Sequence, residues 1–176
     1  ISATDAGVDL TRGDFDLAIR YGTGRYPGLV VELLLGNEVF PACSPALLRD
    51  GPPLETPADL RHHALIHDHQ SERDPLAPTW SMWLKAAGVD DAASTHGLSF
   101  NNNVLALEAA LAGHGVTLAY STTAAADIAA GRLVRLFSLS LPDNFAYYIV
   151  TAPGTLERPK VKAFRDWLRE ESDAQN

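Results

Sequence analysis

The sequence has one cysteine and no long apolar run, and each shortage removes a class of protein. A single thiol, Cys43, allows no internal disulfide, which is typical of a reducing compartment. It follows an apolar run without a histidine or acid at a known motif spacing, so we expect a structural thiol rather than a nucleophile. No uncharged run is long enough to cross a bilayer, and no signal peptide is visible. We therefore expect a cytoplasmic protein without a membrane partner.

Basic residues are also scarce. The 14 lysines and arginines stand against 22 aspartates and glutamates, which gives a formal charge of -8. Because nonspecific affinity for nucleic acid comes from lysine and arginine, we do not expect this acidic sequence to bind a phosphate backbone. Any DNA contact would have to come from a segment outside this sequence. The opening at Ile1, in what looks like the middle of an element, predicts that such upstream residues exist.

Catalytic motifs are missing as well. The sequence contains no G-x-S-x-G, no H-E-x-x-H, no phosphate-binding P-loop and no convincing pair of carboxylates. This absence favours a binding protein over an enzyme, and we expect no cofactor.

Histidines gather in one place, at His62, His63, His67 and His69, together with Asp68. Their spacing matches no established zinc pattern, so we favour a surface histidine cluster at the end of a strand. We expect His67 to face a ligand site. The alternative is a metal-dependent enzyme built on the His62–His69 segment, and stoichiometric zinc in the purified protein would support it.

The most informative stretch runs from Ser99 to Tyr120. It indicates a strand end, a polar turn, an amphipathic helix, a glycine stop and a buried strand, which together make most of a βαβ unit. We expect Val104, Leu107 and Leu111 to form the buried face of the helix, with Leu105 beside them.

Three asparagines, Asn101, Asn102 and Asn103, stand at the start of this helix. Helix starts carry unpaired N–H groups and the positive end of the helix dipole, so they suit anions. A second polar start, Ser121–Thr123, follows the next strand. Ligands of open α/β sheets lie beyond the carboxyl ends of strands, so we expect both starts at one sheet edge. One residue suffices to cap a helix, and three asparagines favour ligand contact over the alternative of capping alone.

Strand-like and helix-like segments alternate along the chain, which predicts an α/β protein with mainly parallel sheets. The expected strands cover residues 15–21, 29–35, 38–43, 64–66, 133–137 and 145–151, and the expected helices start near residues 45, 57, 80, 103, 121 and 159.

A collinear series of short segments resembles the effector-binding domain of LysR-type transcriptional regulators, in the branch of the glycine-cleavage activator and the β-lactamase regulator. The segments are Gly13–Gly22, Pro27–Leu29, Cys43–Leu48, Thr56–Leu60, Trp80–Trp83, Leu107–Ala110 with Gly113–Val116, and Phe164–Leu168. Each segment alone is a weak match, but the segments occur in the same order as in the family, and this order makes the match specific.

The resemblance implies a periplasmic-binding-protein-like fold of two Rossmann-like lobes joined by two crossover strands. Lobe I would combine residues 1–38 with 147–176, and lobe II would comprise residues 39–146. The family's DNA-binding domain, and the first strand and helix of lobe I, would lie upstream of Ile1.

The resemblance also implies a small effector, anionic or zwitterionic, bound between the lobes. By position, Asn101 to Asn103 match the polar turn of lobe II, and Tyr147 matches an aromatic residue on the returning crossover. Tyr21 and Gly22 follow the lobe I strand that faces the cleft, and Ser121 and His67 complete the expected contacts.

The expected function is therefore effector sensing within a regulator that binds DNA through its absent N-terminal domain. In the full-length protein we expect a homo-oligomer. The alternative of the same fold is the solute-binding protein of a transporter, which an upstream signal peptide would indicate.

Overall fold

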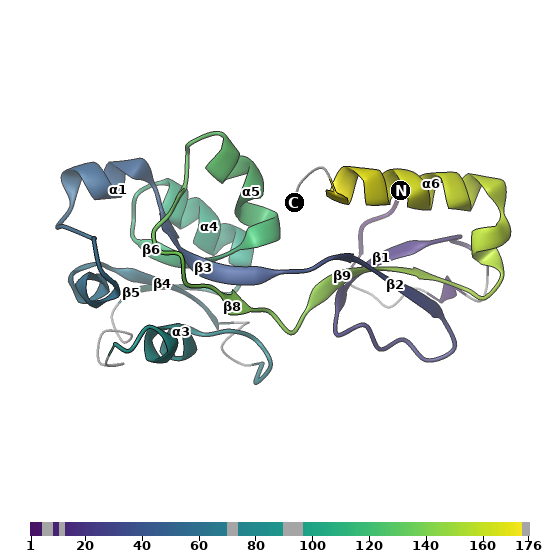
Figure 1. Ribbon diagram of the computed structural model, residues 1–176, viewed down its shortest axis with the longest axis horizontal. Coiled ribbons are helices and arrows are strands. Elements are labelled where there is room, and N and C mark those ends of the chain that lie inside the picture. The colour runs from purple at the N-terminus through teal and green to yellow at the C-terminus, as the bar shows by residue number, and fades with distance from the viewer. Residues whose placement is uncertain (5–8, 11–12, 70–73, 90–96, 174–176) are drawn as a thin grey trace. The chain divides into compact units, whose positions relative to one another are not determined.

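The computed structural model describes residues 1–4, 9–10, 13–69, 74–89 and 97–173. The chain divides into two compact units, each built from a sheet and helices (Figure 1). Unit 1 comprises residues 1–36 and 145–176, and unit 2 comprises residues 37–144.

Unit 1 contains a three-stranded antiparallel sheet in the order β1-β9-β2. Its strands are β1 (Ala18–Gly22), β2 (Val30–Leu35) and β9 (Ala146–Thr151), and the 3-10 helix η4 (Thr155–Glu157) leads into α6 (Pro159–Asp173). Helix α6 lies along this sheet (Figure 1). Arg165 pairs with Glu32 of β2 at 3.1 Å, and the Ser172 hydroxyl donates to the Leu34 carbonyl at 2.9 Å.

Unit 2 contains a larger mixed sheet in the order β5-β4-β6-β3-β7, with β8 paired to β3. The strands are β3 (Glu38–Cys43), β4 (Leu65–Asp68), β5 (Gly97–Phe100), β6 (Val116–Tyr120), β7 (Val134–Arg135) and β8 (Leu141–Pro142). The helices are α1 (Pro45–Asp50), the 3-10 helix η2 (Pro57–His62), α3 (Trp80–Ala86), α4 (Asn103–Leu111) and α5 (Ser121–Ala129). Helices α4 and α5 cover one face of the sheet, and α3 covers the other (Figure 1).

The prediction of mainly parallel sheets is wrong. Among the described strands, only β4 pairs in parallel, with β5 and with β6. Strand β3 pairs antiparallel with β6, β7 and β8. Helices α1 and η2 separate β3 from the next strand, β4, but the two strands do not pair in parallel. Alternation of strands and helices indicates the class of fold, but it does not decide which strands become neighbours.

Several element starts are those that the local sequence predicts. Ser44 caps α1, accepting a hydrogen bond from the Leu47 N–H at 3.4 Å, with Pro45 in the first turn. Thr56 and Asp59 form a capping box, although the segment that follows is a 3-10 helix.

Among the described helices, none is both long and apolar enough to span a membrane.

Helix α4 buries only part of the expected face: Leu107 is buried and Leu111 packs against the core. Val104 and Leu105 are 57% and 51% exposed, and the buried residues are Leu107 and the alanines Ala106, Ala109 and Ala110. Apolar residues occupy almost the whole circumference of this helix, so periodicity does not select a face. Small side chains let the helix lie close against Phe40, Ile66 and Ala119 of the sheet.

The two tryptophans of α3 belong to the core on the opposite face. Trp80 and Trp83 are 4% and 0% exposed, and their rings meet edge to face at 6.3 Å between centroids. The Trp80 Nε1–H donates to the Ile66 carbonyl at 3.0 Å, and that of Trp83 donates to the Leu139 carbonyl at 3.2 Å. The predicted packing role is confirmed.

The single thiol should be inert in the folded protein. Cys43 is fully buried in β3, and burial raises the pKa of its thiol to about 11, so the reactive thiolate is scarce at neutral pH. We expect a disulfide reagent such as 5,5′-dithiobis(2-nitrobenzoate) to react with Cys43 only on the timescale of unfolding. Rapid reaction in guanidinium chloride provides the control, and equally rapid reaction of the native chain would contradict the buried placement.

Candidate functional site

Three strands of unit 2 end at the same edge of the sheet. Strand β4 runs parallel to β5 and to β6, with Ile66 opposite Thr117 and Asp68 opposite Phe100. The last residues of β4, 67–68, and the segments that follow β5 and β6, 101–103 and 121–123, therefore lie at the same edge of the sheet, which we call the carboxyl edge. Because successive connections leave β4 and β6 in opposite directions, the gap between these two strands is a topological switch point.

The asparagines at the start of α4 have three different surroundings. Asn102 is the N-cap, and its Oδ1 accepts from the Val104 N–H at 2.8 Å. Asn103 Oδ1 accepts from the Thr123 hydroxyl of α5 at 3.5 Å, so the two polar helix starts meet. Asn101 is exposed. Capping thus accounts for one of the three asparagines.

The start of α5 is capped from outside the helix. We expected Ser121 to Thr123 to provide the cap, but Ser121 is already the first helical residue and Tyr120 holds the N-cap position. The acceptor is Asn37, whose Oδ1 receives hydrogen bonds from the Ser121 hydroxyl at 3.0 Å and the Thr122 N–H at 3.3 Å. The Ser121 oxygen in turn accepts from the Glu38 N–H at 3.2 Å.

The same Asn37 side chain reaches the last residues of unit 2. Its Nδ2 donates to the Asp143 carboxylate at 3.1 Å, and the backbone carbonyl of Asn37 accepts from the Asp143 N–H at 3.0 Å. Gly36 and Asn37 fall between the two expected strands, 29–35 and 38–43. Strands β2 and β3 belong to different sheets, so this segment is no hairpin. The partners of Asn37 are more than 80 positions away in the sequence, and no local pattern predicts them.

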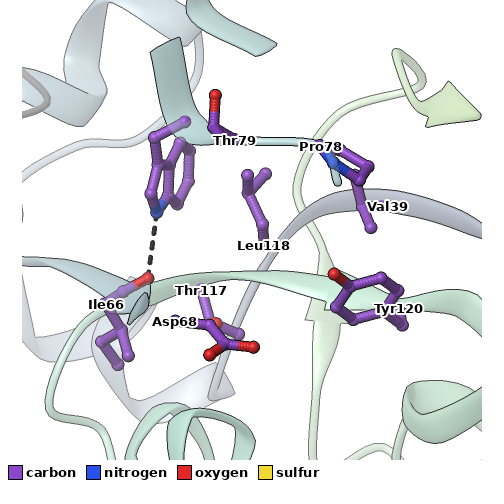
Figure 2. Close-up of a pocket in the computed structure, with 9 residues that line it drawn as sticks. Val39, Ile66, Asp68, Pro78, Thr79, Thr117, Leu118 and Tyr120 are labelled. Carbon is purple, nitrogen blue, oxygen red and sulfur yellow. Dashed lines mark hydrogen bonds between the residues drawn. The ribbon is translucent and has the colours of Figure 1, made fainter. Parts of the chain in front are cut away.

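A surface indentation opens where β4 and β6 diverge beyond the Ile66–Thr117 pair (Figure 2). It contains about 330 Å³ of space, part of it open to solvent. Nine residues line it: Val39, Ile66, Asp68, Pro78, Thr79, Trp80, Thr117, Leu118 and Tyr120. Pro78 and Thr79 lie on one side, and Ile66, Asp68 and Thr117 lie on the opposite side (Figure 2).

Asp68 supplies the one carboxylate among these nine residues, and none of the nine is a lysine or arginine. Trp80 and Tyr120 are aromatic, and Thr79 and Thr117 add hydroxyl groups. The wall therefore combines apolar and polar side chains. Sequence reasoning noted Asp68 only as a possible metal ligand.

The histidines do not form one cluster. His67 is half-buried in β4 and His69 is exposed. His62 is exposed and its Nε2 accepts from Arg61 Nε at 2.9 Å, whereas His63 is only 9% exposed. The expected surface cluster is thus wrong for His63, because β4 begins two residues later and draws it inward. Within the described parts of the chain, no three histidine, cysteine, aspartate or glutamate side chains are arranged to hold a metal ion.

The aromatic residues predicted from lobe I lie together in unit 1. Tyr21 of β1 is directly opposite Tyr147 of β9, with ring centroids 5.0 Å apart, and Phe145 lies 5.7 Å from Tyr21. Tyr21 remains 47% exposed. A Cβ at Gly22 would lie 2.6 Å from the Tyr26 hydroxyl, so a larger residue there would require the Tyr26 side chain to move.

Comparison with known proteins identifies the family. The sequence profile of the LysR substrate binding domain matches residues 2–173. The chain belongs to the LysR substrate-binding domain family. It is 39% identical over 168 residues to the glycine cleavage system transcriptional activator of Escherichia coli, covering 96% of this chain and 53% of that protein. It is 30% identical over 169 residues to the transcriptional activator AmpR of Citrobacter freundii, covering 96% and 55%.

Solved structures agree with this assignment. The effector domain of AmpR from Pseudomonas aeruginosa superposes with a TM-score of 0.71 at 28% identity, covering 96% of this chain and 77% of that one. The AmpR effector binding domain from Citrobacter freundii gives 0.71 at 27% identity, covering 96% and 80%. The predicted α/β, periplasmic-binding-protein-like fold is confirmed.

This LysR substrate-binding domain spans about half the length of the regulators it matches. Those relatives are transcriptional regulators, so the effector-binding interpretation of the chain is confirmed and the transporter alternative is not favoured.

Removal of the Asn37 side chain should destabilise unit 2. Asn37→Ala loses the cap of α5 and the bond to Asp143, and we expect a loss of about 2 kcal/mol in the free energy of unfolding, measured by urea denaturation.

A reciprocal exchange isolates the Asn37–Asp143 bond. Asn37→Asp keeps an acceptor for α5 but opposes two carboxylates, so it should also destabilise the chain. Adding Asp143→Asn restores a donor and an acceptor and should recover most of the lost stability. A double variant no more stable than Asn37→Asp would contradict this pairing.

Proposed function

We propose that this chain senses a small anionic or zwitterionic metabolite within a LysR-type regulator. The observation that carries the proposal is the meeting of two polar helix starts at a switch point of the unit 2 sheet, through the 3.5 Å contact of Asn103 with Thr123. The N–H groups and dipoles at the starts of α4 and α5 favour negative charge at this edge. Membership of the LysR substrate-binding family supports an effector in this role.

The proposed contacts are those derived from the sequence. In unit 2 they are Asn101, Asn102, Asn103, Ser121 and His67. In unit 1 they are Tyr21, Gly22 and Tyr147. The structure adds a distinction within this set: Asn101 is exposed, whereas Asn102 and Ser121 also hold the starts of their helices in place.

We further propose that the whole protein acts without catalysis in the cytoplasm, as a homo-oligomer. Its DNA contacts would come from a segment outside this sequence, since the chain itself carries a formal charge of -8. An effector can shift an equilibrium between arrangements of such a protein only by its different affinity for them. The named relatives are transcriptional activators, which supports a regulatory output.

Substitutions at Asn102 separate ligand binding from helix capping. Asn102→Asp keeps the capping oxygen but places a negative charge at the start of α4, and we expect about tenfold weaker binding of an anionic or zwitterionic effector. Asn102→Ser keeps the cap without the charge and is the matched control. Affinities would be measured by calorimetry with a metabolite found in a thermal-shift screen of the chain.

Equal affinity of the Asp variant, the Ser variant and the unchanged protein would remove Asn102 from the site. A screen of amino acids, small carboxylates and cell-wall fragments that finds no stabilising compound would count against effector sensing itself.

The regulatory part of the proposal is tested on the complete protein. It should retard a DNA fragment from upstream of its own gene in a gel-shift assay, and the identified metabolite should change the affinity or the footprint. Absence of DNA binding by the complete protein would contradict the proposed output while leaving ligand binding intact.

A further inference from the structure

The chain passes between unit 1 and unit 2 twice, and the residues of unit 2 at these two points are bonded to each other. Asn37 Nδ2 donates to the Asp143 carboxylate at 3.1 Å, and the Asp143 N–H donates to the backbone carbonyl of Asn37 at 3.0 Å. Strands β3 and β8 pair directly beside them. Residues 37–38 and 142–143, which we call the crossing segments, are therefore held together.

The start of α5 is bonded both to the crossing segments and to α4. The Ser121 hydroxyl, the Thr122 N–H and the Thr122 hydroxyl donate to Asn37 Oδ1, at 3.0, 3.3 and 3.2 Å. The next residue, Thr123, donates to Asn103 Oδ1 at 3.5 Å. Ser121 and Asn103 are among the effector contacts proposed above. The proposed contacts and the crossing segments therefore meet at this helix start.

Asn37 Oδ1 receives more donors than it has lone pairs. A carbonyl oxygen has two lone pairs, so the three donors share them and each hydrogen bond is weaker than an unshared one. Both hydroxyl bonds, at 3.0 and 3.2 Å, are longer than the usual value of about 2.8 Å. An acceptor brought by a ligand can therefore take one donor while Asn37 keeps the others. A carboxylate is the stronger acceptor, because charge roughly doubles the strength of a hydrogen bond.

Ser121 holds the crossing segments by a second bond as well. Its oxygen accepts from the Glu38 N–H at 3.2 Å, while its hydroxyl donates to Asn37 Oδ1. A rotation of the Ser121 side chain toward a ligand breaks both bonds at once. The two bonds between Asn37 and Asp143 involve no atom of α5, so they persist in either case.

We propose that the effector and Asn37 Oδ1 compete for the donors at the start of α5, so that effector binding releases the crossing segments from this helix. Asn37 is a positioning residue, because it acts through Ser121 and Thr122. The competition rests on the function proposed above and adds how occupancy of the site reaches the points where the chain leaves unit 2. Because linkage is reciprocal, loss of the Asn37 acceptor strengthens effector binding. A purely structural asparagine would have the opposite effect, since its loss would disorder the site.

The first test measures the affinity of Asn37→Ala by calorimetry. The probes are the amino acids, small carboxylates and cell-wall fragments of the thermal-shift screen. We expect a probe that binds the unaltered chain to bind Asn37→Ala about three- to tenfold more tightly, which corresponds to the loss of one competing hydrogen bond. Asn144→Ala is the matched control, because Asn144 is exposed and donates to the Leu76 carbonyl rather than accepting from α5. Its affinity should equal that of the unaltered chain.

A second variant keeps the test decisive if melting curves show that Asn37→Ala is not folded. The exchange of Asn37→Asp with Asp143→Asn leaves the net charge unchanged and keeps a donor opposite an acceptor, but it gives the start of α5 a carboxylate as its acceptor. This stronger competitor should weaken binding of the same probe about threefold or more.

The unaltered chain provides an independent measurement in ¹H–¹⁵N NMR spectra. When a probe saturates the chain, the N–H signals of Thr122 and Glu38 should shift. The Glu38 N–H should also exchange faster with solvent, because Ser121 no longer accepts from it. The Asp143 N–H, which is bonded to the backbone of Asn37, should keep its exchange rate and serves as the internal reference.

Three results would overturn the competition while leaving effector sensing in place. They are a probe that binds folded Asn37→Ala no more tightly than the unaltered chain, an unchanged affinity in the folded exchange variant, and a bound probe that leaves the exchange rate of the Glu38 N–H unchanged. Failure of every probe to bind the unaltered chain would reject effector sensing, and the competition with it.

Discussion

The Asn37 amide is the interaction on which the arrangement of unit 2 depends. The first four N–H groups of a helix need acceptors from elsewhere, and α5 receives one from a residue 85 positions away in the sequence. The same side chain is bonded to Asp143, so the segments by which the chain enters and leaves unit 2 are joined to each other and to the helix. The hydrogen bonds of Asn37 therefore fix the start of α5 relative to both segments. A displacement of this helix start would break or strain those hydrogen bonds.

The carboxyl edge carries two polar helix starts and an indentation of the sheet. Helix starts offer N–H donors and a positive dipole end, and the divergence of β4 from β6 exposes a wall that carries the Asp68 carboxylate. Both features arise from the same topology, since parallel strands place their carboxyl ends together and a change in the direction of the connections leaves a gap between two of them. This shared origin explains why the polar helix starts and the indentation lie in the same part of the sheet.

Local sequence patterns predicted elements well wherever the deciding interaction is local. Strand β3 has the bounds that were expected, Glu38–Cys43, and the serine-proline start of α1 folds as its capping chemistry requires. The buried face of α4 was predicted only in part, because apolar residues surround the helix and only the sheet beneath it selects Leu107 and the alanines over Val104 and Leu105. Likewise His63 is buried by its neighbours in the fold, although its sequence context is polar.

The sequence alone determined the α/β class, the family resemblance, the polar helix starts and the absence of a disulfide, since each depends on residue type and spacing within a short window. The tertiary structure decided the pairing of β3 with β6, the cap that Asn37 gives to α5 and the presence of Asp68 in an indentation with Trp80 and Tyr120. These contacts join residues that are far apart along the chain, and many pairings of the same elements satisfy the same local preferences. Only the packing of the whole sheet, with its helices on both faces, selects one of them.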